Sequence, residues 1–220
     1  MYQVTALETS ADERRVYLGG LAIVDGRAGS PVVITCMLND SLREISANLL
    51  DELDFGAPRR IVRKEGTEVI FIGCDRHIAI MEFIGDRLQQ WASLPNIHDN
   101  EITDMVIRGR FLYTTAFNEP LIKATEFNIG GINGPPPTTN ALTPVAPLLP
   151  PGKPNARYGA FRTDKFPYTG LDDLHKMTTS TDGARVFAGG RGLHRFNTAG
   201  GQLTPIEIDI NKGKEYFLIF

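Results

Sequence analysis

The chain has 220 residues, a net charge of −3 at neutral pH and an isoelectric point near 5.8, and this length is enough for one sizeable core. Its apolar share of 42% and charged share of 22% are those of an ordinary globular protein. Because no basic stripe is present, we expect no binding of nucleic acid through phosphate neutralisation. No apolar run reaches about 18 residues, so we expect no membrane-spanning segment.

The first residues and the cysteines indicate where the protein resides. Residues 1–15 are polar and include Glu8 and Asp12, unlike a secretory signal. Cys36 and Cys74 lie in apolar, strand-like stretches. One disulfide is possible by count, but two reduced and buried thiols are the more usual state inside a cell. We therefore predict a cytoplasmic protein without a disulfide.

The first apolar run, residues 16–20, has the composition of a strand and ends on two turn glycines. The best helix candidate follows at residues 41–53. Leu42, Ile45 and Leu49 lie at helical spacing there, and Ser41 stands where a helix cap would be. The alternative for this segment is a strand followed by a loop.

Two groups of short strands follow, rich in Val, Ile, Phe, Tyr and Thr and separated by Gly, Asp and Asn turns. The first group predicts strands at residues 61–63, 69–73, 77–83 and 88–94. The second group, which has the clearest pattern, predicts strands at residues 102–107, 111–116 and 121–127.

Residues 129–170 are rich in proline and include the triplet at 135–137. Proline has no backbone N–H to donate to a β-ladder, so we predict a long surface loop. Phe161, Phe166 and Tyr168 at its far end suggest that this loop is anchored on the folded body. A plain linker is the alternative, and the sequence does not decide between them.

A last group predicts strands at residues 174–179, 185–188, 193–196 and 203–210. The segment Glu215–Phe220 (EYFLIF) is an apolar, strongly β-prone run. On a sheet edge it would favour pairing with another chain, so we expect self-association through it. It would alternatively complete a sheet begun by Met1–Leu7.

One pattern repeats along the chain: a polar turn, a short apolar and aromatic run, and two further strands. The central runs start at residues 16, 69, 111 and 185, which are 53, 42 and 74 residues apart. The middle interval matches the length of a four-stranded propeller blade, about 40–45 residues. We predict an all-β protein with one β-propeller domain over residues 1–220, made of about four four-stranded antiparallel blades. Insertions are expected at about 41–55 and 129–170, and the ring is either these blades alone or part of a larger one.

Residues 98–118 resemble a repeat of the WD40 family. That family places a His before the inner strand, a Ser or Thr on the second strand and an Asp in the following turn. His98, Thr114 and Asn118 fall at these places, and Asp75 matches the turn aspartate of the preceding unit. The Trp-Asp pair of the family is absent from the third strands. The resemblance implies a WD40-like propeller, in which His98 is a structural hydrogen-bonding partner of Thr114.

The sequence offers no recognisable metal or cofactor site. The four histidines, at positions 77, 98, 175 and 194, lack the spacing of H-E-x-x-H, and no C-x-x-C occurs. Four oxygen-bearing residues cluster without the alternating register of a calcium loop, so a solvated turn is expected: Asp99, Asn100, Glu101 and Asp104. We predict no metal, no cofactor and, since no G-x-S-x-G is present, no nucleophilic site.

Polar turn residues are the best candidates for binding a protein or peptide. In a propeller, the turns after the second strands line one mouth of the ring, and arginine is a common hot-spot residue. The candidate partner-binding residues are Asp75, Arg76, His77, Asn118, Glu119, Arg191 and His194.

We therefore expect a non-catalytic propeller scaffold for protein–protein contacts. Two alternatives remain open at this point. One is a propeller hydrolase or lactonase with a metal in the central channel, and the other is a structural assembly or oligomerisation module.

Overall fold

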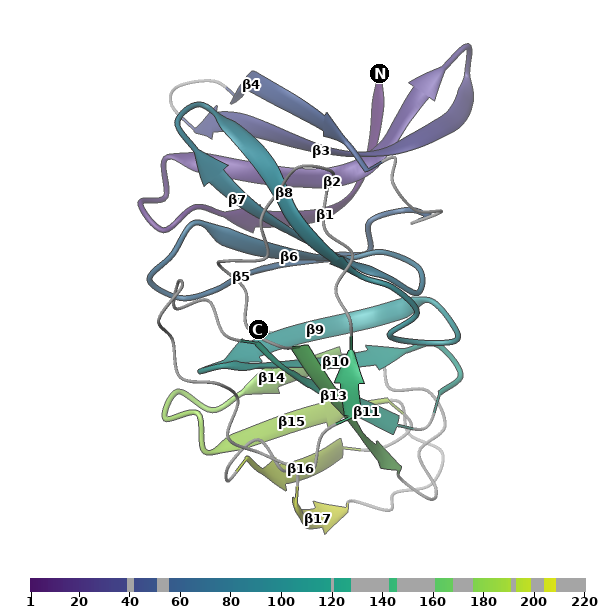
Figure 1. The fold of residues 1–220 in the computed structure, drawn as a ribbon, viewed down its shortest axis with the longest axis vertical. Helices are drawn as coiled ribbons and strands as arrows, with labels where there is room; N and C mark the ends of the chain where they lie inside the picture. Colours follow the sequence, from purple (N-terminus) through teal and green to yellow (C-terminus); the bar gives the residue numbers. More distant parts are fainter. Residues whose placement is uncertain are drawn as a thin grey trace. The chain divides into compact units, whose positions relative to one another are not determined.

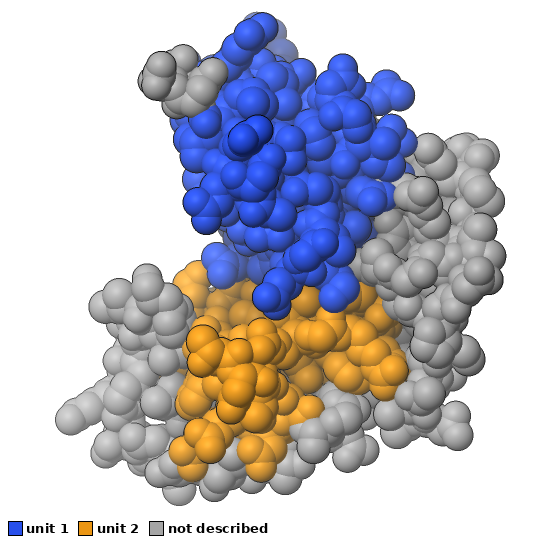
Figure 2. All heavy atoms as spheres, turned by 90° about the vertical axis from the view of Figure 1, so that its left-hand side faces the viewer, with its two compact units in different colours: residues 1–97, 147–153 blue, residues 98–146, 154–220 orange. Residues whose placement is uncertain are grey.

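The computed structural model describes residues 1–38, 42–50, 56–119, 121–127, 143–145, 161–167, 176–190, 193–198 and 204–208. Within these ranges every regular element is a β-strand. The chain divides into two compact units (Figure 2). Unit 1 is Met1–Ile97 with Pro147–Lys153, and unit 2 is His98–Ala146 with Pro154–Phe220.

The first sheet of unit 1 is a meander of four consecutive antiparallel strands (Figure 1): β1 (Tyr2–Thr9), β2 (Arg15–Val24), β3 (Arg27–Leu38) and β4 (Leu42–Leu49). The helix expected at residues 41–53 is wrong, because Leu42–Leu49 pairs with β3 along its whole length. A bulge explains the misleading spacing. The register shifts opposite Thr35 and Cys36, which leaves Ile45 without a partner and breaks the alternation of a regular strand.

The second sheet of unit 1 has the same order: β5 (Arg60–Arg63), β6 (Val69–Gly73), β7 (Ile78–Ile84) and β8 (Arg87–Leu94). All five residues of β6 are buried. One apolar core joins the two sheets, with Tyr17 and Val33 from the first and Ile70 and Ile72 from the second. Because each sheet alone leaves an apolar face uncovered, this shared core stabilises the pair.

Unit 2 begins with a five-stranded sheet whose first three strands are β9 (Ile102–Arg108), β10 (Phe111–Ala116) and β11 (Leu121–Glu126). The next two strands lie inside the proline-rich region, β12 (Thr143–Val145) and β13 (Phe161–Pro167), and the order is β12-β13-β11-β10-β9. The predicted loop over 129–170 is therefore wrong in these two stretches. This end of the segment is anchored on the folded body, as one of the two interpretations predicted, because Phe166 pairs with Ile122 of β11. Phe161 pairs with Val145 of β12, and Tyr168 lies outside the described residues.

The second sheet of unit 2 is a four-stranded meander: β14 (Lys176–Thr179), β15 (Arg185–Gly189), β16 (Leu193–Asn197) and β17 (Thr204–Ile208). Its buried residues Met177, Val186 and Phe196 share a core with Tyr113 and Ile122 of the preceding sheet. The terminal segment 215–220 lies outside the described residues, so its expected self-association stays a prediction.

Candidate functional site

One turn geometry recurs at the start of the second strand in two sheets. In the first sheet, the Ser10 hydroxyl accepts from the Arg15 N–H at 2.9 Å and donates to the Asp12 carboxylate at 2.6 Å. Ser180 and Asp182 make the same two bonds in the last sheet, at 3.0 and 2.5 Å. The bond from serine lowers the pKa of each aspartate. The turn thereby fixes where Arg15 enters the sheet.

Arg15 then joins a cluster around Glu68 between the two sheets of unit 1. The Tyr17 hydroxyl donates to Glu68 Oε2 at 2.6 Å, and an Arg15 guanidinium nitrogen lies 3.4 Å from the same oxygen. The Ala11 N–H donates to Glu68 Oε1 at 3.2 Å. Burial and the Glu68 carboxylate raise the pKa of Tyr17, so its hydroxyl stays protonated and remains a donor. The Arg15 guanidinium also lies over the Phe83 ring, 4.5 Å from its centroid.

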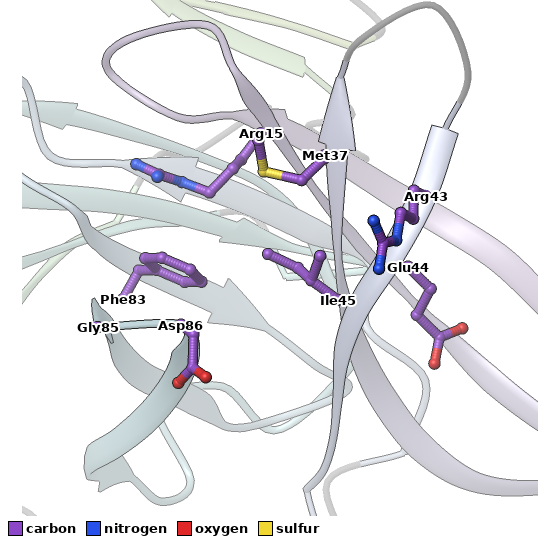
Figure 3. A pocket seen from close by; sticks show the side chains of 8 residues that line it. All are labelled: Arg15, Met37, Arg43, Glu44, Ile45, Phe83, Gly85 and Asp86. Atoms are coloured by element: carbon purple, nitrogen blue, oxygen red, sulfur yellow. The ribbon is translucent and has the colours of Figure 1, made fainter.

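A groove of about 460 Å³ opens beside this cluster (Figure 3), and it is lined by Arg15, Met37, Arg43, Glu44, Ile45, Phe83, Gly85 and Asp86. Figure 3 shows Phe83 and Ile45 pointing into the groove from opposite sides. Arginine, methionine and aromatic residues are the types enriched at protein–protein interfaces. The lining therefore suits a protein segment with both apolar and polar side chains.

A buried polar network organises the first sheet of unit 2. His98 Nε2 lies 2.8 Å from the Thr114 hydroxyl, and His98 Nδ1 lies 2.9 Å from Glu119 Oε2. A carboxylate only accepts hydrogen bonds, so Nδ1 carries the proton and Nε2 accepts from Thr114. The other oxygen of Glu119 accepts from the N–H groups of Asp99 and Asn100, both at 2.7 Å. The network thus ties the turn before β9 to the turn after β10.

The electrostatics of this network favour a charged Glu119 beside a neutral His98. Burial by itself raises the pKa of Glu119, but the bonds from His98 and Asn100 and the nearby Lys123 outweigh it and lower the pKa to about 2. Burial and the Lys123 charge lower the pKa of His98, against the pull of Glu119. Both ring nitrogens of His98 are engaged, so the ring acts as a structural element.

The turn after β10 presents an aromatic side chain on this rigid base. Phe117 is 53% exposed, although all six residues of β10 before it are buried. Its N–H donates to the Glu101 carbonyl at 2.7 Å, and Asn118 adopts a left-handed conformation with φ of 54°. Asn118 is also exposed. The backbone on both sides of Phe117 is therefore fixed while its ring meets solvent.

Asp104 is a second buried carboxylate in unit 2. It accepts from the Met105 N–H at 2.9 Å and from the Met177 N–H at 2.7 Å, so it links β9 to β14. Asp99 and Asn100 instead lie exposed in the turn tied to Glu119. The oxygen-rich stretch is thus divided between a strand-to-strand link and a turn. Across the described residues, no three His, Cys, Asp or Glu side chains are grouped to hold a metal ion.

The partner-binding candidates of unit 1 differ in exposure. Arg76 is exposed, and Asp75 is half-buried with an Oδ1 atom 3.5 Å from Arg59 Nε. His77 is buried, and its Nδ1 accepts from the Asn96 N–H at 3.1 Å. His77 therefore has no ring surface to offer on a rim, which removes it from the partner-binding set.

In unit 2, Glu119 is likewise removed from the partner-binding set, because it is buried in the His98 network. The carboxylate of this turn is that of Glu119, one residue after Asn118, which the WD40 resemblance placed at the turn position. Arg191 lies outside the described residues, and only the backbone of His194 is described. The expected gathering of all these residues at one mouth stays a prediction.

Both cysteines are free and buried, as the sequence predicted. Burial raises the pKa of each thiol, which disfavours the reactive thiolate. Among the described residues, no helix is long and apolar enough to cross a membrane.

The fold is similar to that of solved structures at low sequence identity. A functionally unknown protein from Desulfotomaculum acetoxidans matches over 94% of this chain with a TM-score of 0.61 and 12% identity. The chain spans only 56% of that protein's length. The β-propeller domain of Cps50 (Swd1) from Myceliophteria thermophila matches over 96% of this chain and 73% of its own, with a TM-score of 0.51 and 13% identity.

A Bacteroides fragilis structure described as a "putative 6-phosphogluconolactonase" matches over 98% of this chain and 74% of its own, with 13% identity and a lower TM-score of 0.45. No protein-family model and no curated protein sequence matches the chain. The four-stranded meanders and the likeness to the Cps50 propeller domain together confirm the predicted class: this is an all-β protein with a β-propeller fold.

Sequence reasoning did not find the cluster of Arg15, Glu68 and Phe83 beside the groove. A signal for part of the site was present, because Ser-x-Asp-x-x-Arg occurs at residues 10–15 and again at 180–185. The repeat marks the turn that positions Arg15. Nothing local to Glu68 or Phe83 shows that they meet Arg15, since all three converge only when two sheets pack.

Proposed function

We propose that this chain is a non-catalytic propeller module that binds a protein partner through the turn after β10. The observation that carries the proposal is the exposed Phe117 on a turn held by the buried His98–Thr114–Glu119 network. An aromatic side chain on a fixed backbone loses little conformational entropy when it binds, which is why such residues dominate interface energies. The exposed Asn118 beside it adds polar groups for specificity.

The chemistry of the network supports a structural role over catalysis. A general base needs a lone pair that faces a substrate. In the network, Nε2 of His98 accepts from Thr114, and the Glu119 oxygens accept from His98 and two backbone N–H groups. These groups are occupied in holding the turn.

The groove of unit 1 is the second candidate surface for the same function. It combines Arg15, Arg43 and the Phe83 ring within about 460 Å³. This volume accommodates a few side chains of an extended segment. We expect it to contact a partner independently of the Phe117 turn.

A photo-crosslinking amino acid placed at position 117 tests the main surface in cells that produce the protein. We expect it to capture a specific protein, whereas the same amino acid at the exposed position 65 captures none. Phe117→Ser should also reduce recovery of that protein by about tenfold or more, as expected for an aromatic hot spot. Equal capture from both positions, or equal recovery by Phe117→Ser, would refute the proposal. A stoichiometric divalent metal in the purified protein would instead favour the hydrolase alternative.

A further inference from the structure

The two faces of the first sheet in unit 1 have different surroundings. One face packs on the second sheet, through Ala6, Tyr17 and Val33. Strand register identifies the residues of the opposite face, because directly paired residues point to the same side. Leu7 pairs with Leu18, and Val32 pairs with Leu49. We call this opposite side the outer face.

The middle of the outer face is a continuous apolar layer. Val32, Ile34 and Cys36 of β3 form a cluster of their own, with Leu18 and Ala22 of β2 packed against it. This cluster is separate from the core shared with the second sheet. The sheet therefore has two apolar sides, as expected of a sheet that is sandwiched between two others.

The edges of the outer face expose further large apolar side chains. By register, six such residues surround the buried layer: Tyr2 (40% exposed), Val4 (49%), Leu7 (56%), Leu38 (45%), Leu42 (60%) and Leu49 (53%). Glu44 is paired with Cys36 and is the charged residue on this face of β4. Monomers seldom expose a contiguous apolar patch of more than a few hundred Å², and larger patches mark interaction sites.

We propose that the outer face packs against the outer face of a second copy of this chain. Two apolar sheet faces complement each other without charge pairing, so the surface complements itself as a two-fold interface requires. The contact repeats the face-to-face packing that the same sheet already makes on its inner side. Six half-exposed apolar side chains around a preformed layer supply apolar surface to this contact, and a standard interface buries roughly 800 Å² per partner.

The mass of the full chain in solution tests this proposal. Light scattering should give twice the chain mass of 24.3 kDa, and added salt should not lower this value because the contact is apolar. Leu7→Asp and Leu49→Asp should each return the mass to that of one chain. Both residues are about half exposed in a single copy, so these variants are expected to fold.

Phe117→Asp is the matched control, because it places an aspartate at a 53% exposed apolar residue of unit 2, whereas the outer face belongs to unit 1. It should leave the doubled mass intact while it weakens capture of the partner protein. Leu49→Asp should halve the mass and leave capture of the partner protein unchanged. Each proposal can therefore fail without the other. A wild-type monomer, or a dimer that survives both aspartate variants, would overturn the second copy as the occupant. The second copy would also be ruled out if a different protein bound the wild type and this binding were lost in Leu49→Asp.

Discussion

Glu68 in unit 1 and Glu119 in unit 2 perform similar tasks in different surroundings. Each carboxylate accepts from a ring-bearing side chain, Tyr17 or His98, and from backbone N–H groups of a turn. The Glu68 side chain is 26% exposed, whereas that of Glu119 is 8% exposed. The same kinds of bond therefore contribute differently to stability, because water replaces lost partners at Glu68 and cannot at Glu119.

Removal of the buried carboxylate should have the largest effect. Glu119→Ala leaves the buried His98 Nδ1 without an acceptor and also removes the acceptor of two turn N–H groups. We expect a loss of about 2–4 kcal/mol in the free energy of unfolding, measured with urea. Glu119→Gln should cost less, since its amide oxygen still accepts from the turn. A loss below that of Tyr17→Phe would contradict the difference between the two sites.

Acid pH should have the second-largest effect, because it removes the stabilising contributions of His98 and Glu119. The folded-state pKa of His98 is lowered, so its contribution to stability is complete above its ordinary value of 6.5 and is lost as the pH falls below it. The pKa of Glu119 falls from 4.5 to about 2, so its contribution is complete above 4.5 and is lost between 4.5 and 2. Unfolding curves at several pH values should show both losses. Glu119→Gln should remove the second, and a wild-type stability that is flat from pH 7 to 3 would disagree with this assignment.

Tyr17→Phe tests the exposed site with a smaller expected effect. It removes the hydroxyl that donates to Glu68 and keeps the ring that packs in the core. We expect a loss of about 1 kcal/mol in the free energy of unfolding, because water can hydrate the remaining carboxylate. Urea unfolding at neutral pH measures this loss, and a loss equal to that of Glu119→Ala would contradict it.

The smallest effect should come from the ion pair of Arg15 with Glu68. Arg15→Met keeps an apolar stem over Phe83 and removes the charge. A partly exposed pair contributes about 0.2–1 kcal/mol, and salt screens it. The stability difference between wild type and Arg15→Met should therefore shrink in high salt, whereas that of Glu119→Ala should persist. Equal salt dependence would show that the two sites are equally accessible to solvent.

Much of the fold could be predicted from local pattern, and the failures have physical causes. The strands at 69–73 and 111–116 have the predicted bounds, because apolar runs between turn residues specify them directly. The bulge at Ile45 made β4 look helical. β13 was missed because its neighbour β11 is distant in sequence.

The candidate site was only partly accessible to sequence reasoning. The pairing of His98 with Thr114 follows from the repeat, since both positions are fixed relative to neighbouring strands. The second partner of His98 was not predicted: Asn118 takes the left-handed position of the turn, and Glu119, expected on the rim, turns inward. The exposure of Phe117 has no local signature, since an apolar residue after a buried strand reads as part of the core.

The route of the chain through the third sheet has a consequence for how the protein folds. After Glu126 the chain pairs with β11 again only through β13, and β13 pairs along the whole of β11. During synthesis, β9, β10 and β11 therefore emerge well before the strand that completes them. At about 5–20 residues per second, the edge of β11 waits for a few seconds without its partner. Changing the length of the intervening segment should alter this interval while costing little at equilibrium, because the entropy of closing a loop grows only slowly with its length.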